Sequence, residues 1–400
     1  MVVQMLLTRL PDTCDLNRIR NVVESKSYYG SDCFSEDRVT VVKDFLREIN
    51  ASTSDQLHNF WVSLKFSLRD SVINRSKANL APSRYGVGLV IQFAPSITPI
   101  SALQFALFSV LYGNQIITKI SERSEEFIRS IENFNDANKE LSNRLAKYCQ
   151  FITYDAKRLE ITNLLQSRAG LRVIWGSNDS IQEIRKSSLN PGSSEITFPD
   201  RLSILAVRGA FIDNLEDKDF EKAITNAARD IYEYDHGACS SPFRIFWLGS
   251  NVSDHSFQRF LNKLLMEINT RFEGSWAFST ERQLNHIRAQ IRSSRDTSFI
   301  PGMVNFHVVR DPNNLGNPVG RGNIEVIDID NASQLTKYVP ENLQTCTYLG
   351  FTAEFLRGLF MSSNGPKPTR IVPSGSAMVM TSVWDRYKFA DILSNTYEDY

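Results

Sequence analysis

The sequence carries no excess of charge of either sign, because 45 lysine and arginine residues balance 45 aspartate and glutamate residues. Neither end forms a basic arm or an acidic tail. Binding to nucleic acid depends largely on an excess of positive charge, so this composition argues against a nucleic-acid partner. The apolar fraction of 42% excludes wholesale disorder, and the length of 400 residues suits two or three domains.

Cysteine and histidine are both sparse, with five residues of each. The cysteines are too scattered for a disulfide framework, and neither a CxxC pair nor a histidine cluster indicates a metal site. The N-terminus lacks a basic region and a small-residue cleavage site, so we expect no signal peptide and a cytoplasmic protein. In a reducing compartment a single cysteine is of interest for its reactivity. The cysteines are Cys14, Cys33, Cys149, Cys239 and Cys346.

Short signatures of catalysis and nucleotide binding are missing as well. The sequence has no Walker phosphate loop, no GxSxG and no HExxH. Its single G-x-G, Gly86-Val-Gly88, is too short to be a dinucleotide fingerprint. A function therefore has to be argued from longer segments.

A long uncharged stretch lies between Arg84 and Lys119 and raises the question of a membrane span. Pro95 and Pro99 interrupt this stretch, and several polar residues are scattered along it. A helix that crosses a bilayer requires about 20 unbroken apolar residues. We therefore expect no transmembrane segment here.

The same stretch has the pattern of a buried βαβ unit. Residues 87–93 form an apolar run of strand length, 100–112 form one of helix length, and 116–118 begin a further strand. Parallel strands that are buried on both faces are apolar throughout, which fits the lack of charge. Strands alternate with helices up to about residue 207, and a second such unit follows. The fold class predicted is α/β, with a doubly wound first domain.

Helical segments surround these strands. Residues 37–79 have largely helical apolar spacing. Residues 121–148 predict one charged amphipathic helix, with Ser121 as its N-cap. The proline- and glycine-rich run 310–322 predicts an exposed surface loop.

Cys239 has an unusual neighbourhood, YEYDHGACSSPFRIFWLG. Small residues flank it and an apolar strand follows, so a substrate has room to reach the sulfur, and backbone N–H groups are available to a developing oxyanion. The alternative is an inert buried cysteine, because cysteine is among the most buried residue types. His236 lies three residues earlier and is either a base or a structural residue.

Several segments resemble one known family in the order in which the family has them. The segments are GLVIQFAPSITPISALQFALFSVLYGNQIITKIS, LRVIWGSNDSIQEIR, FPDRLSI, YDHGACSSPFRIFWLG, LQTCTYLG and RIVPSGSAM with VWD after it. They are similar to blocks of LuxC-type acyl-CoA reductases, which belong to the aldehyde dehydrogenase superfamily, and they cover residues 84–385. Several collinear motifs are far more specific than one.

The resemblance implies an aldehyde-dehydrogenase-like fold with a Rossmann-like cofactor domain and an α/β catalytic domain. It also implies NADPH-dependent reduction of a fatty acyl thioester to the aldehyde through a cysteine acyl-enzyme, with NADH not excluded. The acyl donor would be a fatty acyl-CoA or an acyl-protein synthetase, and we expect a homo-oligomer. The expected parts are a helical N-terminal segment (1–80), the cofactor domain (81–207), the catalytic domain (208–375) and a C-terminal segment (376–400).

The family's motifs assign roles to residues of this sequence. Cys239 takes the place of the nucleophile. Lys119 would reach the adenosine ribose or its 2′-phosphate, although a solvated lysine at a strand end is an equal alternative on chemistry alone. Gly176 and Ser177 would face the pyrophosphate at a strand-to-helix turn. The expected cofactor-binding residues are Ala94, Pro95, Ser96, Lys119, Gly176 and Ser177.

Ile97 departs from the family pattern. The family has an asparagine here, whose amide points at the reacting carbonyl oxygen, whereas Ile97 cannot donate a hydrogen bond. Loss of one oxyanion donor costs about a hundredfold to a thousandfold in turnover. Either a hydroxyl of Ser96 or Thr98 replaces it, or the backbone N–H of Cys239 acts alone, or the enzyme is weakened.

Two other functions stay open at this point. One is a CoA-acylating aldehyde dehydrogenase that works in the oxidative direction with NAD. The other is a catalytically weak subunit that scaffolds an acyl-transfer complex, which the Ile97 departure favours. The superfamily's hydrolytic glutamate has no counterpart near Pro199, which suits a reductase that must not hydrolyse its acyl-enzyme.

Overall fold

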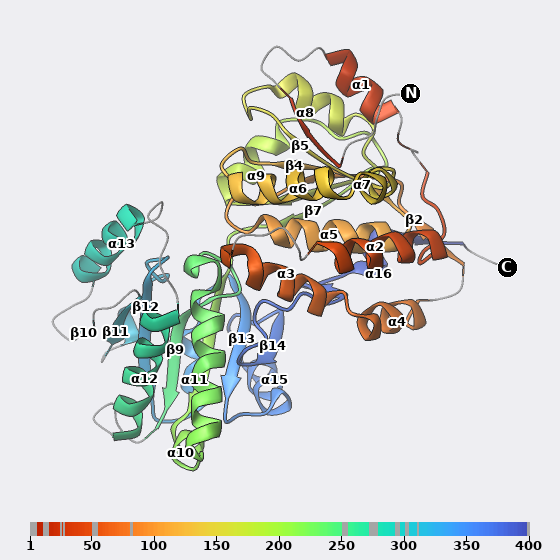
Figure 1. The fold of residues 1–400 in the computed structure, drawn as a ribbon. Coiled ribbons are helices and arrows are strands. Elements are labelled where there is room, and N and C mark those ends of the chain that lie inside the picture. Colours follow the sequence, from red (N-terminus) through yellow and green to blue (C-terminus); the bar gives the residue numbers. More distant parts are fainter. Residues whose placement is uncertain are drawn as a thin grey trace. The chain divides into compact units, whose positions relative to one another are not determined.

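The computed structural model describes residues 6–10, 16–24, 26, 29–49, 55–80, 83–249, 255–271, 279–292, 297–300, 304–309 and 312–397. The chain divides into two compact units (Figure 1). The first contains Met1–Pro199 and Val379–Tyr400, and the second contains Asp200–Met378.

The first unit is built on a six-stranded parallel sheet in the order β1-β5-β4-β3-β6-β7. Every residue of β3, β5 and β6 is buried, as expected for parallel strands that are covered on both faces. The strands are β1 Leu7–Arg9, β3 Leu89–Phe93, β4 Gln115–Ile120, β5 Cys149–Thr153, β6 Leu171–Trp175 and β7 Ser194–Phe198.

The long uncharged stretch forms the predicted βαβ unit of this sheet. Helix α5 (Pro99–Leu111) connects β3 to β4, and nearly all of its residues are buried, which explains why the stretch tolerates no charge. Of the helices in the described ranges, none is both long enough and apolar enough to cross a bilayer.

Helices cover both faces of this sheet. Figure 1 shows α1 and α8 on one side, where they pack on one apolar core with α9, and α5 with α2 on the other. The helices are α1 Leu16–Glu24, α2 Glu36–Glu48, α3 Asp55–Ser67, α4 Asp70–Ala78, α6 Glu125–Ala137, α7 Lys139–Ala146, α8 Leu159–Gln166 and α9 Asn178–Arg185.

The single helix predicted over 121–148 is wrong in two respects. It begins after Ser124 rather than Ser121, and it breaks at Asn138, whose φ of −131° and ψ of 53° lie outside the helical region. Asparagine favours helix ends because its side chain competes for backbone hydrogen bonds. The run of charged residues hid this break, because its apolar spacing continues across Asn138.

The C-terminal segment returns to the first unit. Strand β17 (Ser394–Thr396) pairs antiparallel with β2 (Arg84–Gly86), and the Asn114 amide donates to the Leu393 carbonyl at 2.8 Å. Three further short elements precede β17, namely β15 Val383–Trp384, β16 Tyr387–Lys388 and α16 Phe389–Leu393.

The second unit has a seven-stranded sheet in the order β10-β11-β12-β9-β8-β13-β14. All neighbours are parallel except β10, which is antiparallel to β11. The strands are β8 Leu202–Arg208, β9 Pro242–Leu248, β10 Thr297–Ile300, β11 Asn305–Val309, β12 Asn323–Ile329, β13 Leu343–Leu349 and β14 Arg370–Pro373.

Two apolar cores cover the two faces of this sheet. Helices α11 and α12 pack on one face, and α14 and α15 pack on the other. A further helix, α13, contacts β12 (Figure 1). The helices are α10 Gly209–Asp213, α11 Asp217–Tyr232, α12 His255–Arg271, α13 Ser279–Arg292, α14 Ser333–Tyr338 and α15 Ala353–Ser362.

The compact units have different limits from the parts expected from sequence. All of β8 except its last residue lies in the expected cofactor range 81–207, yet this strand pairs with β9 and β13 in the second sheet. Its inner residues are buried throughout, and such a strand fits the centre of any parallel sheet. The residue pattern of β8 therefore does not show which of two sheets it joins.

Candidate active site

Cys239 lies between the end of α11 and the start of β9, and its side chain is half-buried. The three residues Tyr234, Asp235 and His236 precede it, and all have left-handed backbone conformations, with φ of 59°, 57° and 54°. Each such non-glycine residue costs about 1–3 kcal/mol and persists only where surrounding contacts hold it. We call residues 234–239 the nucleophile turn, after the role that the family resemblance predicts for Cys239.

His236 holds the nucleophile turn with both ring nitrogens. The ring is fully buried, Nε2 donates to the Pro242 carbonyl at 3.0 Å, and the Gly322 N–H donates to Nδ1 at 2.9 Å. Burial lowers the pKa of His236 to about 4, so the ring is neutral near pH 7. A neutral histidine whose acceptor nitrogen is already used cannot take a proton from Cys239, and its role in this turn is structural.

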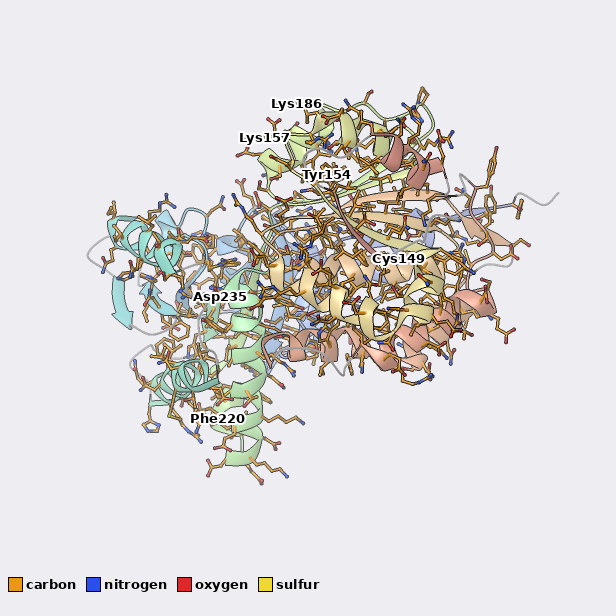
Figure 2. All side chains as sticks on the ribbon, turned by 45° about the horizontal axis from the view of Figure 1, so that its top comes forward. Cys149, Tyr154, Lys157, Lys186, Phe220 and Asp235 are labelled. Atoms are coloured by element: carbon orange, nitrogen blue, oxygen red, sulfur yellow. The ribbon has the colours of Figure 1, made fainter. Side chains whose placement is uncertain are left out.

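Asp235 is held by a helix that is distant in sequence. Arg282 of α13 pairs with the Asp235 carboxylate at 2.7 Å, and both side chains are largely buried. Figure 2 labels Asp235 in the second unit. Because Asp235 is in a left-handed conformation, this ion pair offsets part of its backbone cost.

The carbonyl of Cys239 is fixed from the sheet. The Ser203 hydroxyl on β8 donates to the Cys239 carbonyl at 2.7 Å, and the Thr345 N–H on β13 donates to the same hydroxyl at 3.1 Å. The Ser240 hydroxyl contacts the Met378 sulfur at 3.1 Å. The neighbouring strands β8 and β13 thus set the position of the cysteine backbone.

The end of α11 is tied to the chain after β14. The buried Asp230 carboxylate accepts hydrogen bonds from the N–H groups of Gly375 and Ala377. Burial raises the pKa of Asp230 to about 6 and that of nearby Glu233 to about 7. Two sequence blocks singled out above, around Cys239 and over 370–378, therefore belong to one packed region of the second unit.

Sequence reasoning missed the residues that hold the nucleophile turn. Ser203, Arg282 and Gly322 are 36 or more positions away from their partners in it. Each is an ordinary strand, helix or loop residue in its own segment. Ser203 lies in the FPDRLSI block, but nothing in the sequence identifies its contact with Cys239 or the contacts of Arg282 and Gly322.

The expected cofactor residues gather at one edge of the first sheet. Ala94, Pro95 and Ser96 follow β3, Lys119 is the last but one residue of β4, and Gly176 with Ser177 follows β6. The strand order reverses direction at β3, with β4 on one side and β6 on the other. Ligands of open α/β sheets bind at the carboxyl ends of strands at such a switch point.

The turn after β6 fits a phosphate group. Gly176 has a φ of 154°, and a Cβ atom there would lie 3.3 Å from the Ser180 Cβ. Ser177 is the N-cap of α9, and its hydroxyl accepts the Ser180 N–H at 3.2 Å. The first N–H groups of a helix favour an anion.

Lys119 is a half-buried cation at the same edge. The Ala94 N–H donates to its carbonyl at 2.9 Å, which joins the ends of β3 and β4. Its ammonium nitrogen lies 5.5 Å from the centre of the Tyr154 ring, which Figure 2 labels. Burial lowers the pKa of Lys119, and no carboxylate within the described ranges forms an ion pair with it. Glu122 and Asp155 act on Lys119 at longer range and oppose the effect of burial. A cation without a direct ion pair suits a phosphate.

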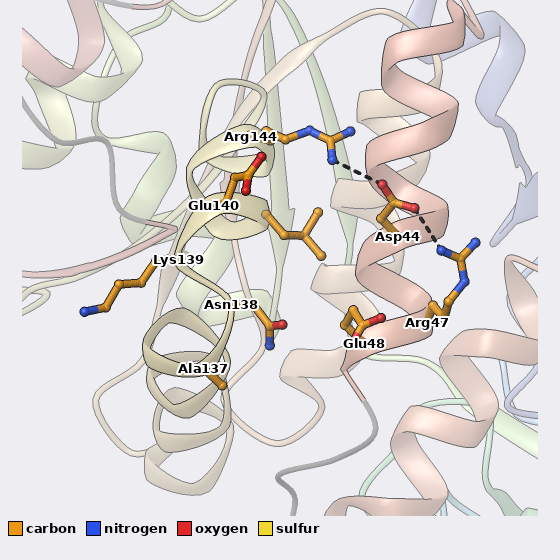
Figure 3. A pocket seen from close by; sticks show the side chains of 9 residues that line it. Asp44, Arg47, Glu48, Ala137, Asn138, Lys139, Glu140 and Arg144 are labelled. Atoms are coloured by element: carbon orange, nitrogen blue, oxygen red, sulfur yellow. Dashed lines mark hydrogen bonds and ion pairs between the residues drawn. The ribbon is translucent and has the colours of Figure 1, made fainter.

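Other chemistry-bearing features of the molecule lie elsewhere. A polar cleft of about 410 Å³ separates α2 from the junction of α6 and α7, where Asp44 pairs with Arg47 and Arg144 (Figure 3). It contains none of the predicted site residues. The described part of the chain has no cluster of three or more histidine, cysteine or carboxylate side chains that would hold a metal ion.

Comparison with known proteins identifies the family. The family model described as acyl-CoA reductase (LuxC) matches residues 70–378, which include the nucleophile turn and the strand-end residues described above. The long-chain acyl-protein thioester reductase of Aliivibrio fischeri is 22% identical over 298 residues. That alignment covers 72% of this chain and 58% of the relative, so the chain spans less than two thirds of the relative's length.

Solved structures show the same fold. An indole-3-acetaldehyde dehydrogenase of P. syringae, in complex with NAD+ and IAA, has a TM-score of 0.66 at 12% identity over 90% of this chain and 81% of its own. An NADP dependent enzyme of E. coli has a TM-score of 0.67 at 10% identity over 94% and 89%. The 1-pyrroline-5-carboxylate dehydrogenase of Thermus thermophilus has 0.60 at 11% identity over 94% and 77%.

These comparisons confirm two predictions from the sequence, the aldehyde-dehydrogenase-like α/β fold and the family resemblance. The family match covers more than half of the chain. The chain belongs to the LuxC acyl-CoA reductase family.

Proposed function

We propose that the protein reduces a fatty acyl thioester to the aldehyde with NADPH, through an acyl-enzyme on Cys239. The observation that carries this proposal is the nucleophile turn, which lies within the family match of residues 70–378. Contacts from β8, α13 and Gly322 hold this strained turn, and its Cys239 thiol is half-buried. Strain that is held in this way is concentrated at functional sites.

The chemistry of the chain's own residues is acyl transfer. The Cys239 sulfur attacks the thioester carbonyl, a new carbon–sulfur bond forms, and the donor's carbon–sulfur bond breaks. The donor leaves as a thiol and takes the proton that the Cys239 thiol loses. When bound, a nicotinamide cofactor would supply the hydride that reduces the acyl carbon. The Cys239 carbon–sulfur bond would then break, so that the sulfur leaves as the thiolate and the product leaves as the aldehyde.

The edge of the first sheet supports a nicotinamide cofactor. Lys119, Gly176 and Ser177 suit phosphate groups for the reasons given above. A cation at Lys119 favours NADPH, which has a 2′-phosphate, over NADH, which has none. For the acyl donor we propose a fatty acyl-CoA or an acyl-protein, the class that appears in the name of the A. fischeri relative.

Cofactor oxidation tests the proposed function. Purified protein is offered NADPH and acyl-CoA thioesters of graded chain length, and both NADPH consumption and aldehyde are measured. Consumption with aldehyde formation supports the reductase, and the length profile defines its substrate class. Faster NAD-driven oxidation of aldehyde plus CoA would favour the acylating dehydrogenase. If no thioester consumes NADPH and no acyl adduct forms on Cys239, the proposed function is wrong.

Replacing Lys119 with alanine is expected to raise the KM for NADPH by about ten- to a hundredfold, because a charge-assisted contact with phosphate contributes about 1.5–3 kcal/mol. The KM for NADH, which lacks the 2′-phosphate, should change much less. Titration with NADP+ measures the same loss without turnover. Lys186→Ala, at an exposed lysine labelled in Figure 2, is the matched control. Equal effects on both cofactors would contradict a role for Lys119 at the 2′-phosphate.

Replacing Ile97 with asparagine is expected to raise kcat by about tenfold or more, because the amide restores an oxyanion donor. Ile97 is 41% exposed in the loop between β3 and α5, so a polar side chain is tolerated there. Ile97→Leu has the shape of the asparagine side chain without its amide, and should leave kcat unchanged. An unchanged or lower rate for Ile97→Asn would show that another group already fills the role.

A further inference from the structure

Helix α13 presents its apolar side to solvent. Leu284, Ile287 and Ile291 recur at the spacing that places residues on one helix face, and they are 49%, 50% and 79% exposed. Asn285 and Ala289 face the protein instead and are buried. A surface helix of a soluble protein normally has the opposite arrangement, with its apolar side inward. We call Leu284, Ile287 and Ile291 the apolar stripe.

Arg288 supplies a positive charge to the exposed side of α13. Arg282 faces the protein instead, where it pairs with Asp235. Glu281 pairs with the buried Arg321 at 3.5 Å. Arg288 is exposed beside the apolar stripe, its guanidinium donates to the Asn285 amide oxygen at 3.3 Å, and no carboxylate within the described ranges pairs with it. The exposed side of α13 thus combines the apolar stripe with Arg288, a cation that no carboxylate within the described ranges neutralises.

The opposite side of the helix holds the nucleophile turn. Arg282 pairs with Asp235 at 2.7 Å. The Asn285 amide donates to the Arg321 carbonyl at 3.4 Å, and the next residue, Gly322, donates its N–H to His236. One helix, which is about 10 Å wide, therefore separates the apolar stripe from the contacts that position the residues before Cys239.

We infer that α13 is the docking surface for an acidic protein that carries the fatty acyl group as a thioester and delivers it to Cys239. This inference rests on the proposed function. An apolar stripe beside an arginine is complementary to a helical protein face with apolar residues and acidic neighbours. Three aliphatic side chains are enough to anchor a protein partner, in which a few residues carry most of the binding energy.

Donor comparison tests this surface. The probes are one acyl chain attached either to CoA or to an acyl carrier protein, which is acidic and holds the acyl group on the same pantetheine thioester. Ile287→Glu is expected to raise the KM for the acyl carrier protein by about tenfold or more and to leave kcat/KM for acyl-CoA within about twofold. Arg288→Glu should act in the same direction. Met361→Glu, at an exposed apolar residue of α15, is the matched control and should change neither donor.

Binding is measured separately from turnover. The anisotropy of a labelled acyl carrier protein should rise when wild-type protein or the Met361→Glu variant is added. Ile287→Glu should raise the dissociation constant for the carrier protein by about tenfold. This result stands even if no thioester is reduced, so the docking surface and the proposed function fail independently. Turnover of acyl-CoA without binding of the carrier protein would overturn the docking surface alone.

Two further outcomes would also overturn the docking surface. Equal losses with both donors would show that α13 acts through the nucleophile turn and has no role in docking. Loss of binding to anionic phospholipid vesicles in Ile287→Glu, with carrier binding unchanged, would assign the apolar stripe to a lipid surface. Thermal unfolding of each variant establishes that it is folded, which is expected because all substituted residues are exposed.

Discussion

Replacing Cys239 with alanine is expected to lower aldehyde formation by about 10⁴-fold or more, because the variant has no sulfur on which the acyl-enzyme can form. NADPH consumption and aldehyde are measured with the acyl-CoA that the wild type uses best. Intact mass should show one acyl adduct on the wild type and none on the variant. Cofactor binding should be retained, because the expected cofactor residues belong to the first unit.

Cys33→Ala is the matched control for this experiment. Cys33 is also a half-buried cysteine, and its thiol donates to the Tyr112 carbonyl at 3.2 Å in the first unit. Its loss should leave turnover within about twofold, since one neutral hydrogen bond contributes only about 1 kcal/mol to stability. An acyl adduct that persists in Cys239→Ala would place the nucleophile elsewhere.

The fold was predictable where burial alone determines the pattern. The uncharged run from 87 to 118 forms β3, α5 and the buried first part of β4, because a strand or helix covered on all sides excludes charge. The same property limits the prediction. Strand β8 is equally apolar, and its membership of the second sheet depends on β9 and β13, which come later in the chain.

The sequence indicated which segment contains the candidate site, but it did not indicate the backbone conformation of that segment or the contacts that hold it. Small residues around Cys239 indicated an accessible sulfur, and the structure places the thiol half-buried. The left-handed conformations of Tyr234, Asp235 and His236 could not be foreseen, because no glycine marks them. Contacts from α13 and the Gly322 loop stabilise them, and such contacts leave no local pattern.

Because His236 is buried, we predict that the stability of the protein depends on pH. Its pKa is lowered from 6.5 to about 4 by burial, so the unfolded chain binds a proton below pH 6.5 while the folded chain does not. The stability that His236 contributes is therefore present above pH 6.5 and is lost as the pH falls to about 4. A pKa difference of this size between the folded and unfolded states corresponds to about 3 kcal/mol in the free energy of unfolding.

Two neighbouring carboxyl groups titrate in the opposite sense. Asp230 and Glu233 have pKa values raised to about 6 and 7, so the stability that they contribute is present at low pH and is lost as the pH rises through those values. The wild-type profile therefore combines opposing trends. Comparison with His236→Gln isolates the histidine, because both carboxyl groups are present in both proteins.

His236→Gln is expected to be about 1–3 kcal/mol less stable than wild type at pH 7, because the buried hydrogen bonds to Pro242 and Gly322 are not both kept. By pH 4 the wild type loses the contribution of the neutral ring, and the two unfolding free energies should converge or cross. Urea denaturation at pH 7 and pH 4 measures this difference. His255→Gln, at an exposed residue of α12, should follow the wild type at both pH values. A stability difference between His236→Gln and wild type that does not change with pH would show that the ring is not held neutral, and the nucleophile turn would then need another explanation for its left-handed residues.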